Sequence, residues 1–160
     1  HRPHGWCQAA ALHHLDQQEL ARVELASLSR EYFRAFSQGL HTTRLFGRAT
    51  VTRLGLMEQP DFAAEMADIL IRLQDTHAAL CLGRHEDTLH ISLRTEPMGQ
   101  NAGKIIQQLI VPPGKAGGHG TMAGGQIPLQ GKEIEPLVTE IEHRFLTVMG
   151  ETDDGVNLIV

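Results

Sequence analysis

A short segment between residues 113 and 125 gathers the residue types that could hold a negatively charged ligand. It contains six of the sixteen glycines of the chain, together with Lys115 and His119. Glycine has no Cβ, so it allows backbone N–H groups to come close to a ligand, and successive N–H groups form an anion-binding concavity. The segment therefore predicts a phosphate- or carboxylate-binding loop, with a plain connector between a helix and a strand as the alternative.

This segment matches neither of two common nucleotide-binding signatures. A P-loop requires Gly-x-x-x-x-Gly-Lys-Ser/Thr, whereas Gly114-Lys115 is followed by Ala116 and no glycine stands five residues before Gly114. The segment also lacks Gly-x-Gly-x-x-Gly placed after a strand. The prediction of an anion site therefore depends on its glycines and on the side chains of Lys115 and His119.

A predicted strand upstream of the glycines carries polar groups on one face. Apolar and polar residues alternate along it, so that a hydroxyl, an imidazole, a second hydroxyl and a guanidinium lie on the same side: Thr88, His90, Ser92 and Arg94. Arginine suits phosphate because its planar fork binds two oxygens at once. From their chemistry, Ser92, Lys115 and Asn101, which can cap the next helix, join the candidate ligand-binding residues.

Helices and strands alternate along the chain that positions these groups. Apolar stripes of helical period follow Asp16, Pro60 and Asn101 and cover residues 132–149, while strand patterns cover 43–53, 76–83, 88–94 and 126–129. This order predicts an α/β fold, a small mixed β-sheet flanked by helices and preceded by a long linker helix.

The predicted domain boundaries follow from that linker helix. It runs from Asp16 to Gln38, with Gly39 as its stop, and serves as a bridge between domains or as a dimer contact. Residues 1–40 are then an N-terminal segment and linker, 41–150 form the binding domain, and 151–160 are a tail or the start of a further domain.

Composition excludes several classes of function. A net charge of −5 argues against a broad electrostatic grip on duplex DNA, although a compact anion held by a few cations fits it. No apolar run approaches the roughly 20 residues of a membrane span, and no signal peptide is evident, so we expect a cytoplasmic protein without membrane contact. Cys7 and Cys81 show no disulfide or metal spacing, and the histidines near the N-terminus lack partners for zinc.

Two motifs in sequence order resemble one family. Ile91-Ser92-Leu93-Arg94-Thr95, followed by a helix and then by Gly117-Gly118-His119-Gly120-Thr121-Met122-Ala123-Gly124, resembles the DHH-associated domain of the DHH phosphoesterase superfamily. This domain is the C-terminal, substrate-gripping half of RecJ-like exonucleases, oligoribonuclease/phosphoadenosine-phosphate phosphatases and exopolyphosphatase-like proteins. The resemblance extends roughly over residues 45–145.

The resemblance implies roles for individual residues. Arg94 and His119 would contact a substrate phosphate or a terminal nucleotide, and the backbone of Gly117 and Gly118 would cradle the same group. The family pattern usually has one more glycine before the histidine and two alanines after it. The present sequence departs from it, with Ala116 in the first place and Met122 in the second.

The catalytic motif of that family does not occur in the sequence. Family catalysis uses an Asp-His-His motif in an N-terminal domain that binds two divalent metals, whereas the adjacent histidines here, His13-His14, follow Leu12. We therefore expect no catalytic residue and no metal site in this chain, with Mn²⁺ or Mg²⁺ held by a missing N-terminal DHH domain as its partner. The ligand would be a short nucleic acid, a nucleotide or polyphosphate, and the chain alone would hydrolyse nothing.

Two other functions stay open on the sequence. The glycine segment also resembles that of the C-terminal domain of alanyl-tRNA synthetases, which predicts a non-catalytic nucleic-acid-binding module, although such modules usually show a basic face. The apolar stripe of the Asp16–Gln38 helix would instead suit an oligomerisation module, with a homodimer as the simplest product. The sequence does not choose between oligoribonucleotide, phosphoadenosine phosphate, cyclic dinucleotide and polyphosphate.

Overall fold

The computed structural model describes residues 26–152 and 154–160. The predicted start of the linker helix at Asp16 and the N-terminal histidines therefore lie outside the described residues. The chain divides into two units, residues 1–34 and residues 35–160. The fold that positions the candidate site belongs to the second unit.

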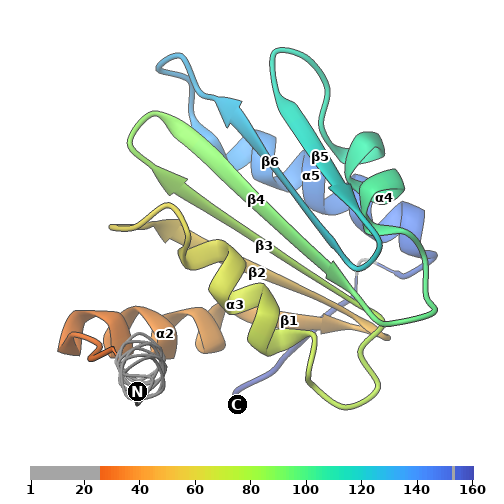
Figure 1. Ribbon diagram of the computed structural model, residues 1–160, viewed down its shortest axis with the longest axis horizontal. Coiled ribbons are helices and arrows are strands. Elements are labelled where there is room, and N and C mark those ends of the chain that lie inside the picture. The colour runs from red at the N-terminus through yellow and green to blue at the C-terminus, as the bar shows by residue number, and fades with distance from the viewer. Residues whose placement is uncertain (1–25, 153) are drawn as a thin grey trace, which may run out of the picture. The chain divides into compact units, whose positions relative to one another are not determined.

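A seven-stranded mixed sheet is the centre of that unit (Figure 1). Its order is β5-β6-β4-β3-β2-β1-β7, and β2 and β3 run parallel while the other neighbouring pairs are antiparallel. The strands are β1 (Thr43–Phe46), β2 (Ala49–Leu56), β3 (Ala78–His85), β4 (Thr88–Thr95), β5 (Lys115–His119), β6 (Met122–Pro128) and β7 (Val156–Asn157). The predicted α/β class with a mixed sheet is confirmed.

Helices cover both faces of the sheet (Figure 1). The described helices are α2 (Arg30–Thr42), α3 (Phe62–Leu70), α4 (Ala102–Leu109) and α5 (Ile134–Met149). One face carries α3 against β3 and β4, and the other carries α4 and α5. Because α3 packs on β3 and β4, it leaves the sheet surface over β5 and β6 uncovered beside it.

The main core lies between the sheet and the pair α4 and α5. Leucines and isoleucines that alternate along β3 and β4 meet the apolar stripes of the two helices there, and all are nearly inaccessible to solvent: Leu80, Leu82, Leu89, Ile91, Leu93, Ile105, Ile106, Leu109, Ile141 and Phe145. Burying a side chain of this size contributes about 1.5–3 kcal/mol. This packing holds β4 in place as the strand on which the polar face is built.

The predicted linker helix is interrupted before Arg30 and ends later than Gln38, while its predicted start at Asp16 lies outside the described residues. Residues 26–29 are not helical, and α2 begins at Arg30, where the Ser29 hydroxyl accepts a hydrogen bond from the Tyr32 N–H at 3.1 Å, as a helix N-cap does. The helix continues through Gly39 to Thr42. Gly39 serves close packing, because a Cβ there would lie 2.9 Å from the Met66 methyl.

Two further segments form hairpins that the sequence pattern did not reveal. The predicted strand at 43–53 is the pair β1 and β2, which turns at Gly47 with a φ of +59°. The predicted glycine loop, with the short strand expected at 126–129, is the pair β5 and β6, joined by a two-residue turn that starts at Gly120 with a φ of +61°. A positive φ favours glycine at both turns. The glycine-rich segment is therefore an edge hairpin of the sheet.

Candidate ligand-binding site

The three strands β4, β6 and β5 align polar residues on one face of the sheet. Residues directly opposite each other in antiparallel strands point to the same face. The register forms three rows across the strands: His90, Gln126 and Lys115; then Ser92, Gly124 and Gly117; then Arg94, Met122 and His119. Adjacent rows are one two-residue step apart, about 7 Å along the strands.

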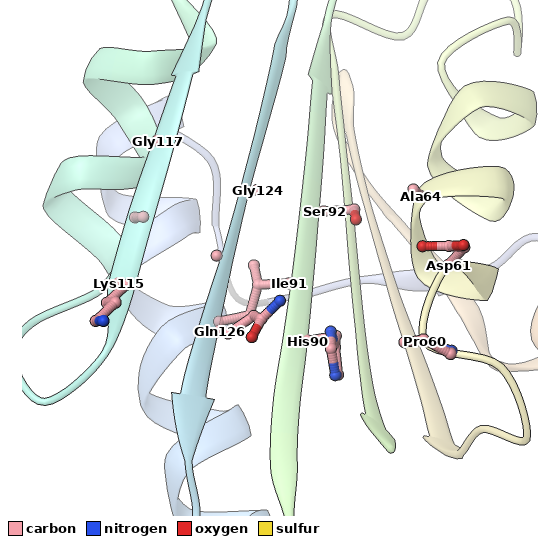
Figure 2. A pocket seen from close by; sticks show the side chains of 12 residues that line it. Pro60, Asp61, Ala64, His90, Ile91, Ser92, Lys115, Gly117, Gly124 and Gln126 are labelled. Atoms are coloured by element: carbon pink, nitrogen blue, oxygen red, sulfur yellow. The ribbon is translucent and has the colours of Figure 1, made fainter. Parts of the chain in front are cut away.

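A pocket of about 500 Å³ opens on this face, between the β5–β6 hairpin and the start of α3. The first two rows form its floor, and Pro60, Asp61 and Ala64 form the wall on the side of α3. Figure 2 shows Lys115 at the β5 side, Asp61 at the α3 side, and His90, Ser92 and Gln126 between them. The sequence-predicted residues Ser92, Lys115 and Gly117 thus meet in one cavity.

Glycines leave the middle of this floor without side chains. A Cβ built on Gly117 would meet no atom within 4 Å, and one on Gly124 would meet only the Ile91 carbonyl oxygen, at 3.3 Å. Neither residue has a positive φ, so the backbone conformation does not require glycine at these positions. Their effect is to keep the pocket open and flat.

Gly118 has a different role from its neighbour. A Cβ there would lie 2.4 Å from the Met122 carbonyl oxygen and 2.5 Å from the Ala123 Cβ, closer than atoms can approach. The Gly118 oxygen is also 2.3 Å from where a Cβ on Gly103 would stand. Gly118 therefore permits close contact of β5 with β6, and Gly103 permits that of α4 with β5, on the side of the hairpin that faces away from the pocket.

The backbone of β5 takes part in the sheet, so the predicted loop of successive bare N–H groups is not formed. The Gln107 side-chain amide donates to the Ala116 carbonyl at 3.3 Å, on the side of α4. Because the N–H and C=O of one strand residue point the same way and alternate along the strand, Gly117 directs its own groups toward β6. Gly117 thus offers the pocket an empty surface in place of a donor.

Arg94 and His119 lie in one row on the same face, but Met122 stands between them. The two residues are therefore two strand spacings, about 10 Å, apart. Arg94 is only 8% exposed, and its Nε donates to the Asp68 carboxylate at 2.6 Å while Nη1 donates to the Leu93 carbonyl at 3.0 Å. His119 is exposed at the hairpin turn. Neither lines the pocket, so the predicted closure of both on a single anion is not seen.

Asn101 acts as a helix cap, as its position before α4 predicted. Its Oδ1 accepts a hydrogen bond from the Lys104 N–H at 3.1 Å, which satisfies one of the free donors at the start of the helix. The helix lies on the face of the sheet opposite the pocket. Asn101 therefore does not line the cavity.

Three polar residues that line the pocket were not selected from the sequence: Asp61, His90 and Gln126. His90 belonged to the recognised alternating face of its strand, so a signal for it existed. Gln126 could be found only through the register of β6, and Asp61 only through the packing of α3. Burial, followed by the nearby His85, lowers the pKa of His90 below 6.5, while Asp61 acts in the opposite direction. His90 is therefore mostly neutral at neutral pH.

Two negative findings apply to the part of the chain that the structure describes. Within residues 26–152 and 154–160, no three His, Cys, Asp or Glu side chains gather closely enough to hold a metal ion. A divalent metal centre therefore has no ligand set among these residues. None of the helices in the same ranges has both the length and the apolar character needed to span a membrane.

Sequence comparison decides the family. The model of the DHHA1 domain matches residues 47–146, most of the α/β unit and the whole of the pocket. The chain belongs to the DHHA1 domain family. This confirms the resemblance of the serine–arginine strand and the glycine–histidine segment to the DHH-associated domain. The chain thus contains an accessory domain of the kind that accompanies the catalytic domain in DHH phosphoesterases.

Several known proteins are similar to this chain in sequence or in structure. An uncharacterized protein of Methanocaldococcus jannaschii is 27% identical over 146 residues, which are 86% of this chain and 30% of that protein. The crystal structure of an exopolyphosphatase-related protein from Bacteroides fragilis matches with a TM-score of 0.64 at 16% identity, covering 84% of this chain and 39% of that one. The chain therefore spans well under half the length of both proteins.

A third similar structure consists almost entirely of the matched region. The C-Ala domain of alanyl-tRNA synthetase from Aquifex aeolicus matches with a TM-score of 0.51 at 19% identity. The match covers 66% of this chain and 97% of the C-Ala domain. At these levels of identity, the two structural matches show a common fold.

Proposed function

We propose that this domain is the substrate-binding part of a metal-dependent DHH phosphoesterase. It binds the phosphate-bearing end of a nucleotide, a short nucleic acid or polyphosphate. The observation that carries the proposal is the pocket itself, in which the row of His90, Gln126 and Lys115 borders a floor of glycines. A flat floor next to an exposed cation admits a tetrahedral anion without steric hindrance. The family match supports the same class of ligand.

Each polar residue of the site would make a different contact with the ligand. The Lys115 ammonium supplies charge, and the Ser92 hydroxyl and the Gln126 amide supply hydrogen-bond donors. His119, at the turn of the hairpin, would contact a ligand that extends beyond the pocket. Arg94 has only Nη2 left for such a contact, since its Nε and Nη1 are already bonded within the described fold.

Hydrolysis in this proposal belongs to a separate N-terminal DHH domain that holds Mn²⁺ or Mg²⁺. The described residues contain no metal cluster, so the present domain contributes binding and orientation of the substrate, which lower the entropic part of the barrier. A role as a nucleic-acid-binding module without a hydrolytic partner is the second candidate. The net negative charge of the chain and the Asp61 carboxylate in the pocket favour this second function less than the first.

The test is calorimetric titration of the chain with 5′-AMP, a short RNA and tripolyphosphate, comparing Lys115→Gln with Lys132→Gln. Both substitutions remove one lysine charge, but Lys132 lies outside this pocket. We expect Lys115→Gln to weaken binding about tenfold, the effect of one charge-assisted hydrogen bond, and Lys132→Gln to leave it unchanged. Arg94→Ala and His119→Ala test the two outer contacts. Equal affinities for the two lysine variants would overturn the assignment of the pocket.

A further inference from the structure

The pocket carries opposite charges at its two sides, which a site for a plain polyanion does not need. Lys115 stands on the β5 side and Asp61 on the α3 side, with neutral groups between them (Figure 2). A carboxylate repels phosphate oxygens at short range. A ligand that fills the whole cavity must therefore place its anionic group at Lys115 and a different group at Asp61.

The carboxylate of Asp61 is available to such a group. Asp61 is the N-cap residue of α3, yet its side chain makes no capping hydrogen bond. Within the described residues it also forms no ion pair or side-chain hydrogen bond with any partner. An ionised carboxylate is a pure acceptor, and Asp61 is exposed, so its oxygens can accept hydrogen bonds from a ligand in the pocket.

The distances in the pocket fit a sugar between the two charged sides. His90 and Lys115 are two strand spacings apart, about 10 Å, and Asp61 lies beyond His90 on the wall of α3. A nucleotide has neutral donors, its sugar hydroxyls, next to its phosphate, whereas polyphosphate has no donor at neutral pH. Acidic side chains commonly recognise a ribose through its 2′-hydroxyl.

We infer that Asp61 is a specificity-determining residue whose carboxylate accepts hydrogen bonds from the sugar hydroxyls of a ribonucleotide that has its phosphate at Lys115. The inference rests on the proposed function and narrows its ligand. The pocket selects ribonucleotides over deoxyribonucleotides, which lack the 2′-hydroxyl, and over polyphosphate, which the carboxylate repels. The bare floor at Gly117 and Gly124 lets the sugar approach the backbone closely.

The experiment measures the affinities of 5′-AMP, 5′-dAMP and tripolyphosphate for the full chain and for Asp61→Asn. Asparagine has nearly the same shape as aspartate, and the Asp61 side chain makes no capping hydrogen bond that could be lost, so the variant keeps the fold while losing the charge. We expect the native chain to prefer 5′-AMP to 5′-dAMP about tenfold, the effect of a hydrogen bond to a charged group. Asp61→Asn should reduce that ratio toward one and bind tripolyphosphate more tightly.

Glu58→Gln is the matched control, because it removes one negative charge from the same connection before α3 but lies outside the pocket. A ratio of 5′-AMP to 5′-dAMP affinities that is unchanged in Asp61→Asn would overturn the inference. So would equal binding of 5′-AMP and tripolyphosphate by the native chain.

The two proposals fail in different ways. If Lys115→Gln weakens the binding of all three ligands while Asp61→Asn leaves the ratios of their affinities unchanged, the phosphate site is supported and the sugar contact is wrong. If none of the three ligands binds the native chain, both proposals are wrong. A structural role of Asp61 at the helix start would alter the melting temperature of Asp61→Asn without changing the preference for ribose.

Discussion

Gly117 and Gly118 are adjacent and chemically identical, yet the structure predicts opposite effects when each is replaced by alanine. At Gly117 an added methyl would meet no atom within 4 Å, and the φ of the residue is not positive. Replacing glycine by alanine at such a site reduces the entropy of the unfolded chain and stabilises by about 0.4–1 kcal/mol. Gly117→Ala should therefore be as stable as the native chain or slightly more so.

At Gly118 the same methyl would stand 2.4 Å from a backbone oxygen of Met122. The strands must move apart to admit it, and overpacking of this kind costs about 1–3 kcal/mol. The two variants should therefore differ by about 2–3 kcal/mol in unfolding free energy. At roughly 3 °C per kcal/mol for a chain of this size, their melting temperatures should differ by about 6–9 °C.

Thermal and urea unfolding followed by circular dichroism would measure this difference directly. Binding gives an independent readout, because the Gly117→Ala methyl enters the pocket and should weaken 5′-AMP binding in a chain that is fully folded. Equal melting temperatures of the two variants, or a less stable Gly117→Ala, would refute the placement of the two residues on opposite sides of the hairpin.

Two further predictions concern titratable groups, the partly buried His90 and the fully buried Cys81. Because burial lowers the pKa of His90 below its ordinary 6.5, the unfolded chain binds a proton more readily and stability falls as the pH drops below 6.5. Urea unfolding near pH 7.5 and near pH 5.5 should show a larger loss of unfolding free energy for the native chain than for His90→Gln. Equal losses in the two proteins would contradict this prediction. Burial raises the pKa of the Cys81 thiol to about 12, although a hydrogen bond with Thr52 lowers it in part. In a Cys7→Ser background, Cys81 should therefore react with a thiol reagent only after denaturation, and rapid labelling of the folded chain would show that it is accessible.

Much of the fold could be predicted from the sequence because the signals that specify it are local. The alternation along residues 88–94 identified β4 and its polar face, and the apolar stripes of α4 and α5 located the helices that bury the other face. The motif with Arg94, followed by the segment with His119, indicated the family through residue types and spacing alone. The periods of strands and helices are read from near neighbours in the chain, so these features need no tertiary information.

The division of roles within the site was decided by tertiary structure. Strand register sets which residues share a row, and it placed Met122 between Arg94 and His119. The packing of α3 brought Asp68 to Arg94 across 26 positions of sequence and Asp61 to the edge of the pocket. The sequence thus determined by itself the class of fold, the family and the segments that carry polar groups. Only the tertiary structure decided which of those groups meet, because pairing and packing join residues whose separation in the chain leaves no periodic signal.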